Sequence, residues 1–143
     1  MKYKQTIEKL MQDGLINTND KFAFCKYYNK LTAGDIFWAA GGLVSFRWTD
    51  YDYLLSTDGK VIKIFNIDKK TGEYTGQSTT VEKEIINKLT CKKYALIELM
   101  GRYKIDIHAK SIKFMLNAIT VPTFKGFDQS ANYKELINAL QHF

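Results

Sequence analysis

The chain has few of the residues that form disulfides, interrupt helices and strands, or bind metal ions. Its 143 residues include one proline, two cysteines and two histidines. Cys25 and Cys91 form no CxxC pair, so we expect two buried free thiols in a reducing compartment and no disulfide. His108 and His142 have no cysteine or carboxylate partner at metal-ligand spacing. We therefore expect neither a metal nor a cofactor.

Long apolar runs are also missing. No stretch approaches the roughly 18 apolar residues of a membrane-spanning helix, and the polar start of the chain lacks the apolar core of a secretory signal. These absences predict a cytoplasmic protein without a transmembrane segment. Hydrophobic residues make up 45% and charged residues 25% of the chain, which excludes an intrinsically disordered protein.

Motifs that carry catalytic chemistry are missing as well. Gly41-Gly42 is followed neither by the Lys-Ser/Thr of a phosphate loop nor by a helix, and no serine lies in a Gly-x-Ser-x-Gly elbow. Asp50 and Asp52 lack the further oxygen ligands of a calcium loop, so we interpret them as turn carboxylates. We therefore expect a protein that is not an enzyme, with an enzyme of unrecognised class kept as an alternative.

Arginine is scarce although the chain is basic. Of 21 basic residues only Arg47 and Arg102 are arginines, and the net charge of +6 is spread along the chain. A diffuse lysine excess is typical of a solvated surface. Nucleic-acid binding stays open as an alternative, with tyrosines for stacking, but it is weakened because bidentate recognition prefers arginine. The phosphate contacts would come from Lys60, Lys63, Lys69, Lys70, Lys92 and Lys93.

Aromatic residues are abundant, at 14% of the chain, and they favour strands. Asp58-Gly59 predicts a tight turn between strands at 51–55 and 61–67, because both residues tolerate left-handed angles. A second turn leads to an edge strand at 73–81, and strict alternation predicts a half-buried strand at 103–109. Further short strands are expected at 36–40, 43–46, 85–89, 95–100 and 112–116, with a turn of helix as the alternative within 81–89.

Two helices are expected before these strands. The first has apolar residues at helical spacing until Gly14, which can end a helix in a left-handed turn. The second is expected to start from a cap within 17–20 and to stop at 32–34. The apolar face of the first consists of Tyr3, Ile7, Leu10 and Met11, and that of the second of Phe24, Tyr28 and Leu31.

One more helix is expected after Pro122, at the end of the chain. Asn132 and Glu135 have the spacing of a capping box, with Asn in place of the usual Ser or Thr. The apolar face of this helix consists of Tyr133, Leu136, Ile137 and Leu140. A single helix laid over the open end of a bent sheet is an economical way to bury that end.

About seven strands followed by one helix resembles the pleckstrin-homology superfold, and in particular the bacterial pleckstrin-homology-like domains. The pieces that carry the resemblance are residues 34–40, the hairpin at 53–64, the paired strands at 103–109 and 112–116, and the terminal helix. The resemblance covers roughly residues 33–143. It implies a ligand- or protein-binding scaffold. Phosphoinositide binding is not carried over, because only Arg47 contributes a cation where phosphoinositide-specific members have their basic signature.

The expected fold class is therefore α+β. It is a small, mostly antiparallel bent sheet or barrel of about seven strands, with two N-terminal helices and one C-terminal capping helix. The expected organisation is an N-terminal helical segment at 1–32 packed on a pleckstrin-homology-like domain at 33–143.

The favoured function is a non-catalytic cytoplasmic module that binds a protein or a small ligand. The richness in Lys, Asn, Ile and Tyr suits an AT-rich bacterial or phage genome, and a phage-encoded protein acting on a host protein is one form of this hypothesis. Phe46, Arg47, Trp48 and Tyr51 are the candidate contact, since Trp and Arg are common interface anchors. Trp48 could equally be a core residue.

Overall fold

The computed structural model describes residues 2–27, 36–38, 45–47, 50–93, 102–109 and 114–143. Within them lie two α-helices, the short 3-10 helix η2 and eleven strands. In chain order these are α1 (Lys2–Gln12), β1 (Lys21–Tyr27), β2 (Ile36–Trp38), β3 (Ser45–Arg47), β4 (Asp52–Thr57), β5 (Val61–Ile67), β6 (Tyr74–Glu82), η2 (Lys83–Ile85), β7 (Lys88–Lys93), β8 (Tyr103–Ala109), β9 (Phe114–Thr120), β10 (Thr123–Phe124), β11 (Phe127–Asp128) and α2 (Ser130–Gln141). No helix among these residues is long and apolar enough to cross a membrane.

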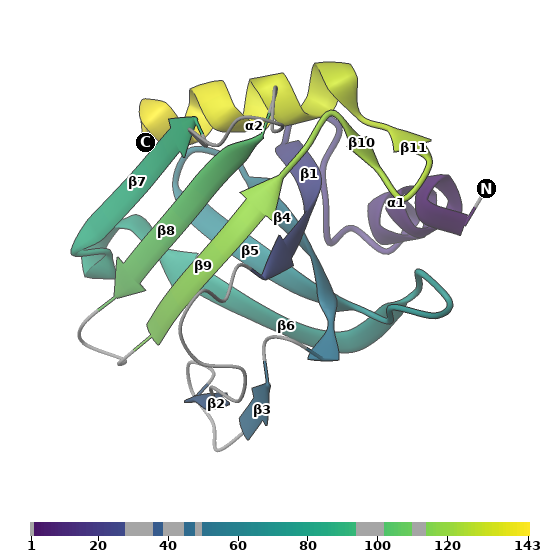
Figure 1. Cartoon of the computed structure of the whole chain (residues 1–143), viewed down its shortest axis with the longest axis horizontal. Coiled ribbons are helices and arrows are strands. Elements are labelled where there is room, and N and C mark those ends of the chain that lie inside the picture. Colours follow the sequence, from purple (N-terminus) through teal and green to yellow (C-terminus); the bar gives the residue numbers. More distant parts are fainter. Residues whose placement is uncertain (1, 28–35, 39–44, 48–49, 94–101, 110–113) are drawn as a thin grey trace.

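Seven of the strands form one sheet in the order β6-β5-β4-β1-β9-β8-β7, with antiparallel neighbours throughout. Figure 1 shows that the sheet is strongly bent, so that β7, β8 and β9 lie in front of β4, β5 and β6 and cross them. α2 lies along one end of this structure and contacts β1, β4 and β7. β10 and β11 pair with each other beside α1.

The bent sheet has two separate apolar cores. Its inner face packs with the apolar face of α2 around Tyr53, Leu55 and Ile107. The outer face of β1, β4 and β5 is covered by α1 and by the β10–β11 hairpin. Tyr3 of α1 docks there, with its ring centroid 5.0 Å from that of Phe24 in an edge-on contact, an arrangement that aromatic pairs prefer.

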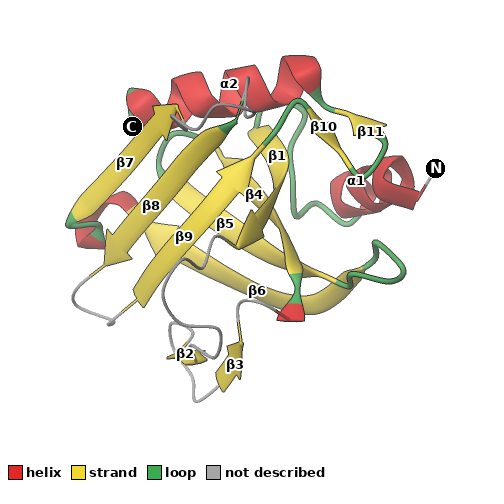
Figure 2. Cartoon of the chain, in the orientation of Figure 1, coloured by secondary structure: helices red, strands yellow, loops and turns green. Residues whose placement is uncertain are grey.

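The expected second N-terminal helix is wrong, because residues 21–27 form β1 at the centre of the sheet (Figure 2). Ala23 and Cys25 enter the inner core, and Phe24 enters the outer core. A strand buried on both faces shows no polar alternation, and a short apolar run of this kind cannot be told from a helix by its periodicity. Among the described residues, α1 is therefore the one helix that precedes the sheet. The expected boundary near residue 33 falls outside the described residues.

The two hairpins predicted after residue 50 are confirmed. β4 pairs with β5, and β5 pairs with β6, which is an edge strand. In the first turn the Asp58 carboxylate accepts hydrogen bonds from the backbone N–H groups of Lys60 and Val61, and these bonds hold the pKa of Asp58 below its usual range. Gly59 has φ 93°, as the turn requires.

Other strand predictions have mixed outcomes. The alternating strand at 103–109 is confirmed as β8, and its odd-numbered residues face the inner core. The short helical turn that was the alternative within 81–89 is present as η2. The strands expected at 36–40 and 43–46 pair with each other as β2 and β3, in a small sheet apart from the large one. The strand expected at 95–100 lies outside the described residues.

The apolar face predicted for the C-terminal helix is confirmed, because Tyr133, Leu136, Ile137 and Leu140 are all buried. The predicted capping box is wrong. α2 begins at Ser130, two residues before Asn132, and its N-cap residue is Gln129. The spacing of the apolar residues predicted the buried face of α2. The first residue of α2 depends on the β10–β11 hairpin that precedes it, and this hairpin was not predicted.

Both cysteines are free thiols beside the inner core; Cys25 is buried as the sequence predicts, whereas Cys91 is only half-buried. Burial raises the pKa of Cys25 to about 12, and burial together with the Asp106 carboxylate raises the pKa of Cys91 to about 12. Each thiol stays protonated in the folded chain at pH values where it would already ionise in the unfolded chain. The protonated thiol therefore makes its full contribution to the free energy of unfolding below about pH 9, and this contribution is lost as the pH rises towards 12.

We expect the native protein to react very slowly with an aromatic disulfide reagent at pH 8. The raised pKa values lower the thiolate fraction about a thousandfold relative to an unperturbed thiol. Both thiols should react rapidly after unfolding in guanidinium chloride, and absorbance of the released thiolate measures both rates. Rapid reaction of either cysteine in the native protein would contradict the burial described above.

Candidate functional site

Two adjoining hollows lie where β1 and β9 approach the β10–β11 turn. The larger has a volume of about 410 Å³ and the smaller about 160 Å³. Both are lined by Lys26, Tyr27 and Lys125, so they share a wall, and we call the two hollows together the cleft. Arg102 lines only the larger hollow, and the smaller one adds Tyr51, Asp52 and Lys69.

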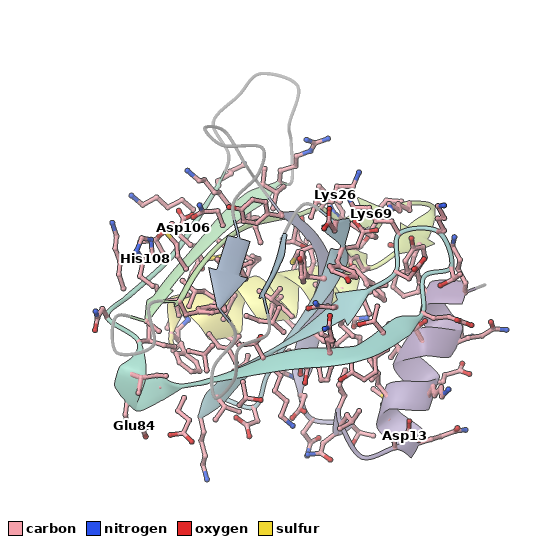
Figure 3. All side chains as sticks on the ribbon, turned by 90° about the horizontal axis from the view of Figure 1, so that it is seen from below. Asp13, Lys26, Lys69, Glu84, Asp106 and His108 are labelled. Atoms are coloured by element: carbon pink, nitrogen blue, oxygen red, sulfur yellow. The ribbon has the colours of Figure 1, made fainter. Side chains whose placement is uncertain are left out.

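The cations of the cleft come from four separate segments. Lys26 is the next-to-last residue of β1, and Lys69 lies in the turn between β5 and β6. Arg102 immediately precedes β8, and Lys125 lies in the turn between β10 and β11. Figure 3 shows Lys26 and Lys69 near each other, in agreement with their shared hollow. Only the bent sheet brings these four side chains together.

The β10–β11 turn explains why Lys125 projects into the cleft. Lys125 has φ 47° and Gly126 has φ 83°, so both residues of this two-residue turn are left-handed. Such turns match the twist of antiparallel strands and favour glycine in the second position. The turn places the Lys125 ammonium 5.6 Å from the centroid of the Phe124 ring, in a cation–π contact.

Asp52 is the acidic residue of the cleft, and its side chain is 1% exposed. It stands directly opposite Lys26 across the β1–β4 pairing. One carboxylate oxygen, Oδ2, accepts a hydrogen bond from the ammonium of Lys125, with which it forms an ion pair. The other oxygen, Oδ1, is buried and has no hydrogen-bond partner among the described residues. Asp52 is therefore a buried carboxylate with one oxygen satisfied.

Among the described residues, those that line the cleft carry more positive than negative charge. Four cationic side chains and one carboxylate line the two hollows, and that carboxylate is paired with Lys125. Lys26 is exposed, Arg102 is exposed, and neither forms an ion pair with a residue that the structure describes. Tyr27 and Tyr51 are half-buried and add hydroxyl groups to the wall. This arrangement can attract and hold an anion.

The contact expected at residues 46–51 is only partly described. The backbone of Phe46 and Arg47 forms part of β3, and Trp48 lies outside the described residues. Tyr51 lines the smaller hollow and packs against the inner core. Whether Trp48 is a core residue or an interface residue stays a prediction.

The six lysines of the nucleic-acid hypothesis lie on different parts of the fold. Lys60 follows β4, whereas Lys69 and Lys70 lie beyond the opposite end of β5. The Lys63 ammonium donates a hydrogen bond of 3.1 Å to the backbone oxygen of Leu15. Lys92 and Lys93 end β7, at the far edge of the sheet from β6. Of the six, only Lys69 is among the residues that line the cleft.

The histidines and acids of the chain do not assemble a metal centre in the part of the chain that is described. His108 lies on β8, on the face opposite the inner core, and His142 follows α2 with Nδ1 2.8 Å from the backbone oxygen of Asn138. Asp50 is exposed, whereas Asp52 is buried in the cleft. The interpretation of Asp52 as a turn carboxylate is therefore wrong, because it begins β4 and faces Lys125.

Sequence reasoning missed Lys26, Arg102, Lys125 and the role of Asp52. Each of these residues stands alone in the sequence, next to a strand end or in a turn, and shares no motif with the others. Gly126, which lies between two aromatic residues in the chain, is the one local feature that could have pointed to a turn at this place, and it gives no sign of the charged partners.

No protein-family model matches the chain, and no curated protein matches it. A solved structure, the hSac2 domain from human phosphoinositide phosphatase Sac2, is similar with 11% sequence identity and a TM-score of 0.42. The alignment covers 97% of this chain and 83% of that domain. At this TM-score the likeness carries no argument about this chain.

Proposed function

We propose that this protein is a non-catalytic binding module that takes a small anionic ligand in the cleft. The observation that carries the proposal is the convergence of Lys26, Lys69, Arg102 and Lys125 on one concave surface. Cations that are spread over the sequence and meet in a hollow produce a concentrated positive potential, which a solvated lysine face does not. A guanidinium can also hold a phosphate or carboxylate through two parallel hydrogen bonds.

The shape of the cleft agrees with a small ligand. The larger hollow, at about 410 Å³, falls in the range of roughly 300–1,000 Å³ that is typical of small-molecule sites. Ile119, Val121 and Phe124 supply an apolar wall beside the cations. Such a wall lowers the local dielectric and strengthens each charge–charge attraction.

A pleckstrin-homology-like scaffold is part of the same proposal. Its support is the meander β1-β4-β5-β6, joined through β1 and β9 to the meander β7-β8-β9, with α2 across one end. The number of strands and the closing helix agree with the predicted pattern, but the sheet contains β1, which was expected to be a helix, in place of the strands expected at 36–40 and 43–46. Binding of a protein partner through residues 46–51 stays a prediction beside it.

Charge reversal in the cleft tests the proposal. Lys26→Glu and Arg102→Glu should each weaken the binding of inorganic phosphate at least about tenfold, because each removes a charge-assisted hydrogen bond and adds a repulsive carboxylate. Titration of phosphate into ¹⁵N-labelled protein, followed by amide chemical shifts, measures the dissociation constant. Both residues are exposed, so the fold should be retained.

Lys134→Glu is the matched control, because Lys134 is an exposed residue of α2 that does not line the cleft. It makes the same change in net charge and should bind phosphate nearly as the unaltered protein does. If all three substitutions weakened phosphate binding equally, the effect would come from net charge alone and would contradict a site in the cleft. Unchanged binding in both cleft variants would contradict the proposed site.

A further inference from the structure

The buried carboxylate in the cleft is costly for a site that binds anions. Asp52 is among the residues that line the smaller hollow, and its charge repels any anion that enters. Lys125 compensates Oδ2, whereas Oδ1 has no partner among the described residues. A buried polar atom without a partner is uncommon in folded proteins, and an unpaired acceptor invites a donor. Oδ1 has almost no exposed surface, so a ligand reaches the Asp52 carboxylate only where Lys125 turns away from it.

We propose that Asp52 makes the cleft selective for anions that carry a hydrogen-bond donor next to the anionic group. The ligand class is a phosphate ester with a neighbouring hydroxyl or amino group. Its phosphate is held by Lys26, Arg102 and Lys125, and its donor is held by the carboxylate of Asp52. This inference rests on the proposed function, because it requires that the cleft bind anions.

The selectivity follows from Lys125, because its ammonium is needed both by Asp52 and by the phosphate of the ligand. The side chain of Lys125 is 30% exposed, so its ammonium can turn from Asp52 towards a phosphate. That movement weakens the one ion pair that the described residues make with this carboxylate, whose side chain is 1% exposed. Leaving a buried charge without its partner is strongly unfavourable. A ligand hydroxyl or amine that donates to Asp52 removes this cost, whereas the dianion of an alkyl phosphate has no hydrogen to donate and does not.

The position of Asp52 allows one ligand to make both contacts. Its Cα is paired with that of Lys26 across neighbouring antiparallel strands, and the side chains of such directly opposite residues point to the same face. The donor-binding and anion-binding groups are therefore neighbours on one surface. A compact ligand with adjacent phosphate and hydroxyl groups can contact both.

Two probes of equal charge and similar size test the selectivity in the unaltered protein. Glycerol 3-phosphate carries hydroxyl groups, and n-propyl phosphate carries none. We expect glycerol 3-phosphate to bind about tenfold more tightly, as a hydrogen bond to a charged acceptor implies. Isothermal titration calorimetry or amide shifts measure both constants. Equal affinities would overturn the inference and leave the proposed function intact, whereas failure of every phosphate to bind would contradict the proposed function itself.

Asp52→Leu tests whether this residue is the acceptor. After this substitution the two ligands should bind with about equal affinity. Binding of n-propyl phosphate should also become tighter, because Lys125 is released from its ion pair. The matched control is Asp50→Leu, which removes an exposed carboxylate nearby and should keep the preference. A preference that survives in Asp52→Leu would overturn the assignment. Thermal unfolding confirms that both variants are folded.

A lipid headgroup and a free metabolite can share this chemistry. Cosedimentation with vesicles of phosphatidylcholine and phosphatidylglycerol distinguishes them. Pelleting that is lost in Asp52→Leu supports the inference with a headgroup as the source. Selectivity for glycerol 3-phosphate without pelleting supports it with a soluble ligand as the source.

Discussion

Removal of residues 130–143 is expected to leave a chain without a cooperative unfolding transition. α2 buries Tyr133, Leu136, Ile137 and Leu140 against the inner core. Each buried side chain of this kind contributes about 1.5–3 kcal/mol, and together they approach the whole stability of a domain, about 5–15 kcal/mol. Calorimetry and near-ultraviolet circular dichroism measure the loss.

A milder substitution separates the role of the core contact from the effect of truncation. Leu136 is fully buried, and Leu136→Ala should lower the free energy of unfolding by about 2–5 kcal/mol. Lys134→Ala, on the exposed side of the same helix, should change it by less than about 0.5 kcal/mol. A truncated chain that keeps a sharp thermal transition would show that the sheet is stable without its helix.

Gln129→Ala is expected to be the most destabilising single change of a polar side chain. Gln129 is 1% exposed, and its Oε1 accepts a hydrogen bond of 2.8 Å from the backbone N–H of Phe24. Its Nε2 donates to the backbone oxygens of Phe24 at 3.0 Å and Val121 at 2.8 Å. The β1–β9 pairing stops at Cys25, and the Gln129 side chain supplies the hydrogen bonds to β1 at the next residue, Phe24.

The loss should amount to about 2 kcal/mol, because the substitution leaves the buried backbone N–H of Phe24 without its partner and removes two further hydrogen bonds. Chemical denaturation, with the unfolding slope compared between variants, measures the change. Gln141→Ala is the control, since Gln141 is exposed and its Nε2 donates to the backbone oxygen of Cys91 at 3.2 Å. An equally small effect of both substitutions would contradict the role assigned to Gln129.

Local chemistry was enough to predict the parts of the fold whose signals lie within a few residues. Asp58-Gly59 located the β4–β5 hairpin, and alternation located β8. The apolar spacing of Tyr133, Leu136 and Ile137 identified the buried face of α2. In each case one face of the element contacts the core and the other contacts solvent. Apolar residues therefore recur in the sequence at the spacing of a strand or a helix.

The same reasoning failed where both faces of a strand are buried. Phe24 and its neighbours in β1 carry no polar alternation, because α1 covers one face of the strand and the inner core covers the other. Helical spacing of Phe24, Tyr28 and Leu31 then arose by chance. The choice between helix and strand at residues 21–27 was made by the partners β4 and β9, which lie far away in the sequence.

The amino-acid sequence by itself determined the antiparallel hairpins, the free thiols and the excess of positive charge. Only the tertiary structure decided where that charge is concentrated. Lys26, Lys69, Arg102 and Lys125 are separated by long stretches of chain, and the bend of the sheet brings them to two adjoining hollows, the smaller of which contains Asp52. The physical reason is that hairpin signals act between near neighbours in the chain, whereas a cleft depends on how distant strands pair and on which faces their partners cover.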